Sequence, residues 1–67
     1  MTDDDIIAEF RERAAIIEYD AELSRPIAES MALRDIVRRY GMDAGKVVQR
    51  WRAVQMAREL AGTVVMR

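Results

Sequence analysis

Apolar side chains recur at helical spacing in three successive stretches of the chain. In the first stretch they fall three or four residues apart, at Ile6, Phe10, Ala14, Ile17 and Ala21. This spacing places side chains on one face of an α-helix. Thr2 precedes the stripe and Asp5 stands three residues later, in the arrangement of a capping box. The pattern predicts a helix over about residues 3–22.

The second stretch begins with a helix start signal. Ser24 is a favourable N-cap, and Pro26 fits the first turn, where its missing N–H costs nothing. We therefore expect a helix over about residues 25–40. Its inward row would be Ala28, Ala32, Ile36 and Tyr40.

A glycine corner separates the second stretch from the third. Gly41 can end the second helix, and Asp43 is expected to cap a third helix over about residues 44–61. Met42 would contact Val37 on one side of the corner and Val47 on the other. The other glycines are interpreted as helix punctuation, and the inward residues of the third helix are expected to be Val47, Trp51, Val54, Ala57 and Ala61. The tail after Gly62, "TVVMR", is either a frayed end or a small dimer contact.

These elements predict an all-α fold, a three-helix bundle that forms one domain over residues 1–67 with a short C-terminal tail. A chain of 67 residues buries only about 60% of the surface that its unfolded form exposes. It contains no cysteine and no histidine, so neither disulfides nor the usual zinc ligands are available to stabilise it. Dimerisation, or docking on a larger partner, is the most available further source of stability, and a homodimer is expected.

Composition also narrows the classes of function. Without histidine or cysteine and without a glycine-rich phosphate loop, we expect no enzyme activity, no cofactor, no metal and no small-molecule substrate. The acidic start "MTDDDII" does not resemble a secretory signal, and the longest apolar runs are far shorter than the roughly 20 residues of a membrane helix. The sequence predicts a cytoplasmic protein that does not insert in a membrane.

Charge is divided unevenly along the chain. Residues 1–33 carry nine acidic and three basic side chains, a net charge of −6, whereas residues 34–67 carry three acidic and eight basic ones, a net charge of +5. One interpretation is that each helix simply solvates its own outer face. The other is that the basic half meets a nucleic acid or that the acidic half meets a basic protein.

The corner supplies the parts of a DNA-reading element. A helix that enters the major groove needs a tight stop before it, apolar anchors inside, and long polar side chains outside. Lys46, Gln49, Arg50 and Ala53 share one outward face by their spacing, and glutamine and arginine can pair with adenine and guanine edges. Phosphate contacts are expected from arginines that flank this face. The candidate DNA-binding residues are Arg38, Arg39, Lys46, Gln49, Arg50 and Arg52.

Residues 33–51, "LRDIVRRYGMDAGKVVQRW", resemble the helix-turn-helix segments of bacterial regulators and transposase-like proteins. The resemblance implies a small sequence-specific transcriptional regulator. Two positions depart from the motif. Val37 stands where those segments have a small residue four before the glycine, and Trp51 comes ten residues after Gly41 where nine is common.

A second hypothesis assigns the activity to the acidic half. The protein would then be a small inhibitor or adaptor, similar in role to an antiactivator, an anti-defence protein or an antitoxin. Its binding face on the first helix would consist of Glu9, Glu12, Glu18, Asp20 and Glu22. The segment 12–32, "ERAAIIEYDAELSRPIAESMA", is similar to one that recurs in small phage and plasmid proteins, which implies a mobile-element setting.

Overall fold

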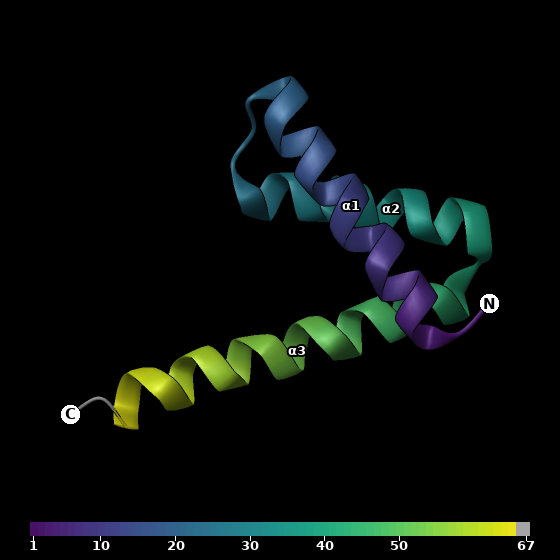
Figure 1. Cartoon of the computed structure of the whole chain (residues 1–67). Helices are drawn as coiled ribbons and strands as arrows, with labels where there is room; N and C mark the ends of the chain where they lie inside the picture. Colours follow the sequence, from purple (N-terminus) through teal and green to yellow (C-terminus); the bar gives the residue numbers. More distant parts are fainter. Residues whose placement is uncertain (66–67) are drawn as a thin grey trace.

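Three helices make up the computed structural model, which describes residues 1–65 (Figure 1). They are α1 (Asp3–Ala21), α2 (Arg25–Tyr40) and α3 (Met42–Val65). The predicted all-α three-helix fold is confirmed. The predicted bounds of α1 and α2 are correct to within one residue, whereas α3 begins two residues earlier than predicted and continues through Gly62 to Val65. The last residues of the predicted tail, 66–67, lie outside the described residues.

Local signals set the ends of α1. The Thr2 N–H donates to the Asp5 carboxylate at 3.1 Å, and the Asp5 N–H donates to the Thr2 hydroxyl at 3.2 Å. The predicted capping box is therefore confirmed, and these hydrogen bonds with Thr2 hold the pKa of Asp5 below its ordinary value. Glu22 ends the helix in the left-handed conformation with φ of 54°. In α2, Ser24 occupies the N-cap position as predicted, although its side chain forms no capping hydrogen bond.

The hydrophobic core lies where the three helices meet. Its side chains are Ile6, Phe10 and Ala14 of α1, Ala32 and Ile36 of α2, and Ala44 and Val48 of α3. Trp51 packs against this cluster, with its ring 6.1 Å from that of Phe10 in an edge-to-face arrangement. Edge-to-face contact suits the positive edge and negative face of aromatic rings.

The first two predicted stripes agree with the core, apart from one position at the end of each. Ala21 is exposed at the end of α1, where no other helix covers it. Tyr40 is 37% exposed, and its hydroxyl donates a hydrogen bond to the Glu9 carboxylate of α1. In both helices the predicted stripe has the correct spacing, but its last position packed against the core comes one turn earlier than predicted.

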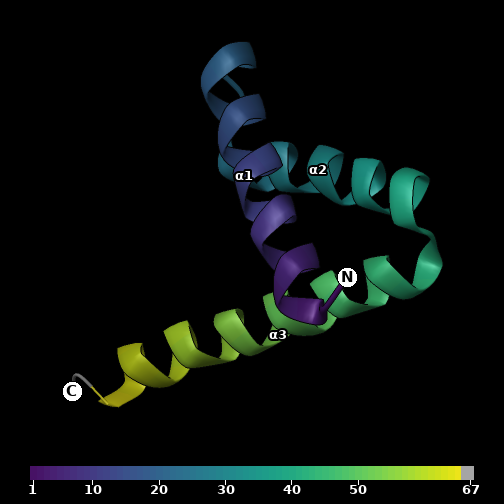
Figure 2. The same cartoon turned by 45° about the vertical axis from the view of Figure 1, so that its right-hand side comes forward.

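The third helix extends well past the core. We call residues 42–52 the proximal half of α3 and residues 53–65 its distal half. In both views the proximal half lies against α1 and α2, while the distal half projects away from them (Figures 1 and 2). The radius of gyration is 13.0 Å, compared with about 11 Å for a compact domain of this length. No helix in residues 1–65 has the length and apolar content needed to cross a membrane.

Candidate nucleic-acid interface

The corner between α2 and α3 is tighter than the sequence predicts. Gly41 is the one residue between the two helices; its φ is +97°, and its N–H donates to the Val37 carbonyl at 2.8 Å. A positive φ is accessible to glycine because it has no Cβ. Asp43 consequently lies within the first turn of α3 and does not cap it. There its carboxylate is near the positive end of the helix dipole.

Close packing at the corner comes from Gly45. A Cβ placed on Gly45 would lie 2.5 Å from the Cγ2 atom of Val37, so α2 and α3 approach closely at this point. In helix-turn-helix segments a small residue at the position of Val37 allows this close approach. Here Gly45 of α3 is the small residue at the contact. The interpretation of Gly45 as punctuation was wrong, since it is buried inside the helix. Met42, which was predicted to contact both sides of the corner, is 67% exposed and is not part of the core.

Val48, not Val47, marks the inward face of α3. The buried row is Ala44 and Val48 with Trp51 half-buried, whereas Val47 is only half-buried at its edge. The predicted inward positions farther along are wrong: Val54 is 44% exposed, and Ala57 and Ala61 are exposed too. The reason is that α1 and α2 cover only the proximal half, so no core exists for these side chains to enter.

Three of the candidate DNA-binding residues lie opposite the core. Lys46, Gln49 and Arg50 are exposed on the proximal half of α3. At 100° per residue they lie about 100–160° around the helix from Val48, which points inward. Arg38, also exposed, stands in the last turn of α2 next to the corner. Within the described part of the chain, no carboxylate forms an ion pair with Arg38, Lys46 or Arg50. Their charges are therefore available to a ligand.

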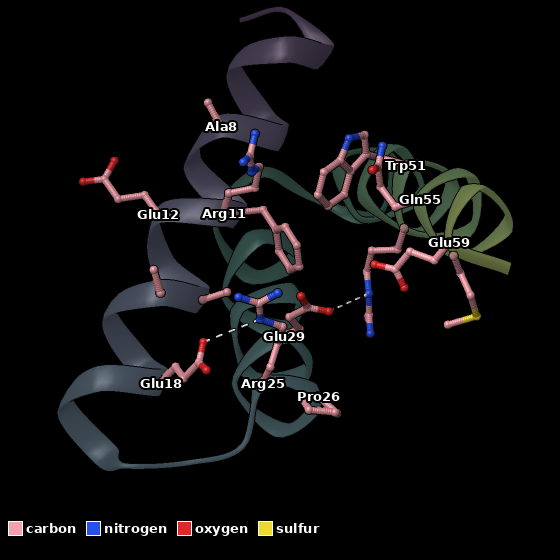
Figure 3. A pocket seen from close by; sticks show the side chains of 15 residues that line it. Ala8, Arg11, Glu12, Glu18, Arg25, Pro26, Glu29, Trp51, Gln55 and Glu59 are labelled. Atoms are coloured by element: carbon pink, nitrogen blue, oxygen red, sulfur yellow. Dashed lines mark ion pairs between the residues drawn. The ribbon is translucent and has the colours of Figure 1, made fainter. Parts of the chain in front are cut away.

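The other two candidates form ion pairs with neighbouring helices. Arg52 lies 3.4 Å from Glu29 of α2, and its side chain is only 31% exposed (Figure 3). Arg39 lies 3.7 Å from Glu9 of α1. Each pair partly neutralises its arginine, although the Arg39 side chain remains 58% exposed. The two pairs were missed because the glutamates stand far away in the sequence, on other helices.

Glu9 stands at the centre of a polar cluster between α1 and α2. The Tyr40 hydroxyl donates to the Glu9 carboxylate at 2.6 Å, and Arg13 lies 3.5 Å from the same oxygen. The hydrogen bond from Tyr40 is the main cause of the lowered pKa of Glu9, with Arg13 next among the groups that lower it. The same bond raises the pKa of Tyr40. Arg13 also reaches Asp35 of α2 at 3.8 Å, so the cluster ties the two helices together.

The remaining members of the predicted acidic face divide into two groups. Glu18 lies 3.8 Å from Arg25 and is partly neutralised by it (Figure 3). Glu12, Asp20 and Glu22 are exposed. With Glu9 held in its cluster, the five residues do not form one continuous unpaired surface.

A groove runs between the inner side of distal α3 and the adjoining face of α1 and α2 (Figure 3). Its volume is about 790 Å³, and side chains of both charges line it, among them Arg11, whose guanidinium lies 5.8 Å from the Trp51 ring centroid. Because the lining contains both arginines and glutamates, the groove selects no single charge. Among the described residues, no cluster of carboxylates could hold a metal ion.

Comparisons of the chain with protein-family models, with curated proteins and with solved structures give no match.

Proposed function

We propose that the protein binds duplex DNA through the outer face of the proximal half of α3. The observation that supports this proposal is the set of Lys46, Gln49 and Arg50, exposed together on the side of α3 that faces away from the core. An α-helix with its side chains is about 10–12 Å wide and the major groove is about 12 Å wide. Since α1 and α2 pack on the opposite side, the outer face can approach a groove without hindrance.

The side chains of this face divide into two chemical roles. Gln49 can pair with adenine and Arg50 with guanine through two hydrogen bonds each, which would supply sequence preference. Lys46 and Arg38 would meet phosphates, which fix position and contribute affinity for any sequence. Arg39 and Arg52 each form an ion pair with a glutamate of another helix, and we leave them out of the contact set. The proposed contacts are therefore four of the six candidates.

The role inferred for such a protein is regulation of transcription, in line with the resemblance of residues 33–51 to helix-turn-helix segments. The single residue at the corner differs from the three- or four-residue turn usual in that motif. For this reason the proposal depends on the face of α3 and does not borrow the docking geometry of the motif. The acidic-face hypothesis receives less support, because Glu9 and Glu18 are engaged within the protein.

Fluorescence anisotropy with labelled duplexes of mixed sequence tests the proposal. Binding should appear at low salt and weaken as salt rises, with a log–log slope of about −0.9 per phosphate contacted. The double variant Lys46→Ala/Arg50→Ala should bind at least about tenfold more weakly, since it loses a phosphate contact and a base contact. Gln49→Ala should reduce the preference among sequences more than it reduces binding to mixed DNA.

A charge-matched control separates this face from general attraction to DNA. Arg25→Ala/Arg58→Ala also removes two positive charges, from exposed positions at the start of α2 and in distal α3. Its affinity for DNA should stay within about twofold of the unaltered protein, because neither side chain lies on the proposed face. Equal losses in both double variants, or no salt-sensitive binding at all, would contradict the proposal.

A further inference from the structure

The apolar side of α3 changes along the helix. In the proximal half the apolar side chains point into the core, as Val48 does. Continuing that row leads to Gln55, which faces the groove with polar neighbours. Over residues 53–61 the apolar residues on the outer side are Ala53, Val54, Ala57, Leu60 and Ala61, and Met56 lies at the edge between this side and the groove. We call these six residues the distal apolar face.

None of the six residues of this face is buried by the rest of the protein. Leu60 is 63% exposed and Met56 is 60% exposed. Among the described residues, none beyond Trp51 belongs to the core or packs against it. A helical segment as short as the distal half is only marginally stable in water without tertiary contacts. Both its exposure and its length indicate that something packs against the distal apolar face.

The exposed area is large enough for a protein interface. A compact monomer of 7.7 kDa exposes about 4,300 Å². This chain exposes 5326 Å², an excess of about 1,000 Å². A standard stable interface buries about 800 Å² on each partner. The excess therefore matches what one further chain of similar size would cover.

We infer that the distal apolar face binds the same face of a second copy of this chain. Ala53, Ala57 and Leu60 follow one another at spacings of four and three residues, the repeat that lets two helices pack side by side. The alanines allow close approach, and the flanking Val54 and Met56 widen the contact. Two identical stripes of this kind are complementary to each other under two-fold symmetry.

The interface is confined to the distal half. Lys46 and Arg50 lie on the outer face one to two turns before it, and like charges from two copies would repel there. In each copy, α1 and α2 lie on the inner side of α3 (Figure 2), away from the proposed contact. The inference does not depend on DNA binding, because the residues that carry it are different ones.

Sedimentation equilibrium of the full chain without DNA tests the inference. Over a range of about 1–500 µM, the mass should rise from 7.7 kDa toward twice that value, as for an interface at the small end of the standard range. Leu60→Glu should weaken the dimer at least about tenfold, because it places a charge in the contact. Ala57→Leu should weaken it as well, because the larger side chain prevents the close approach that the alanines allow. Far-UV circular dichroism should show both variants still folded.

Gln55→Glu provides the control, since it adds one negative charge to the distal half of the same helix but on the groove side. Its dimerisation should remain within about twofold of the unaltered chain. A monomer at every concentration, or a dimer that Leu60→Glu leaves unchanged, would overturn the inference. The DNA proposal would stand in either case, and conversely a dimer that binds no DNA would overturn only that proposal.

Discussion

The two halves of α3 differ in what holds them in place, although they form one continuous helix. The proximal half contributes Ala44 and Val48 to the core and is crossed by both other helices. Among the residues whose side chains are described, the distal half contributes nothing to the core, and its Val54, Met56 and Leu60 are exposed. Within one chain, the same secondary structure is thus stabilised by packing in one part and left to local propensity in the other.

This difference indicates a division of roles along α3. A helix that presents base-reading side chains must be held in place by packing, because a mobile helix cannot keep those side chains in position for hydrogen bonds to the bases. The proximal half, which carries Lys46 and Arg50, meets that condition. The distal half has exposed apolar side chains and few contacts with α1 and α2. These are properties of a surface that becomes ordered when it binds a partner. Substitutions that act on one half alone test this division.

The largest effect is expected from the side chain that anchors the proximal half. Phe10 is 1% exposed and contacts Trp51, so Phe10→Ala leaves a cavity between α1 and α3. Such truncations cost about 3–5 kcal/mol, as much as the total stability of many domains of this size. Thermal unfolding followed by circular dichroism should show a largely unfolded protein at room temperature.

Leu60→Ala is the comparison in the distal half. At concentrations too low for association it should change the free energy of unfolding by no more than about 0.5 kcal/mol, as surface substitutions do. An equally large loss from Leu60→Ala in the monomer would show that the distal half is part of the cooperative core. The division between the halves would then be wrong.

Gly45→Ala should have a smaller effect, and one specific to the proximal half. The added Cβ would meet Val37 at 2.5 Å, and valine is a stiff neighbour. Overpacking of this kind costs about 1–3 kcal/mol, while replacing a helical glycine by alanine returns up to about 1 kcal/mol. A net loss of about 1 kcal/mol is expected in urea unfolding.

The partner substitution supplies the control for this prediction. In Val37→Ala/Gly45→Ala the Cγ2 atom is gone, so the alanine at position 45 should cost less than it does beside Val37. The double-mutant cycle should therefore give a favourable coupling between the two sites. Additive effects would mean that α2 and α3 do not approach closely there.

Much of the fold follows from the sequence because the signals for α1 and α2 are local. Their stripes repeat every three or four residues and begin at Thr2 and Ser24, next to the helix starts. The register of α3 could not be predicted in the same way. Apolar residues occur on several of its sides, and both Val47 and Val48 continue a plausible row to Trp51. Packing against α1 and α2 determines which row is buried, and the sequence of α3 alone does not predict that packing.

The candidate site was predictable to a similar degree. Spacing alone places Lys46, Gln49 and Arg50 on one side of a helix, and the structure has all three exposed. Spacing cannot identify the partners of Arg39 and Arg52, because an ion pair between helices depends on how those helices cross. The hydrogen bond between Tyr40 and Glu9 escaped prediction for the same reason.

Tyr40→Phe should have the smallest effect, and it tests whether the two halves respond separately. The hydrogen bond from Tyr40 keeps the pKa of Glu9 in the folded protein below its unfolded value of about 4.3. The ionised Glu9 therefore contributes stability above that pH, and the contribution is lost as pH falls through the lower folded pKa. Removing the hydroxyl should raise the pKa of Glu9, as measured by NMR titration of its side-chain carboxyl carbon.

The control for that titration is Tyr19→Phe, because Tyr19 is 85% exposed and, among the described residues, has no hydrogen-bond partner. It should leave the pKa of Glu9 unchanged. Glu9 and Tyr40 join α1 to the end of α2, directly before the corner from which α3 starts. The amide signals of residues 42–52 should consequently shift in Tyr40→Phe while those of residues 53–61 stay in place. Shifts of equal size in both segments would show that the corner transmits strain along the whole helix, against the independence of the two halves.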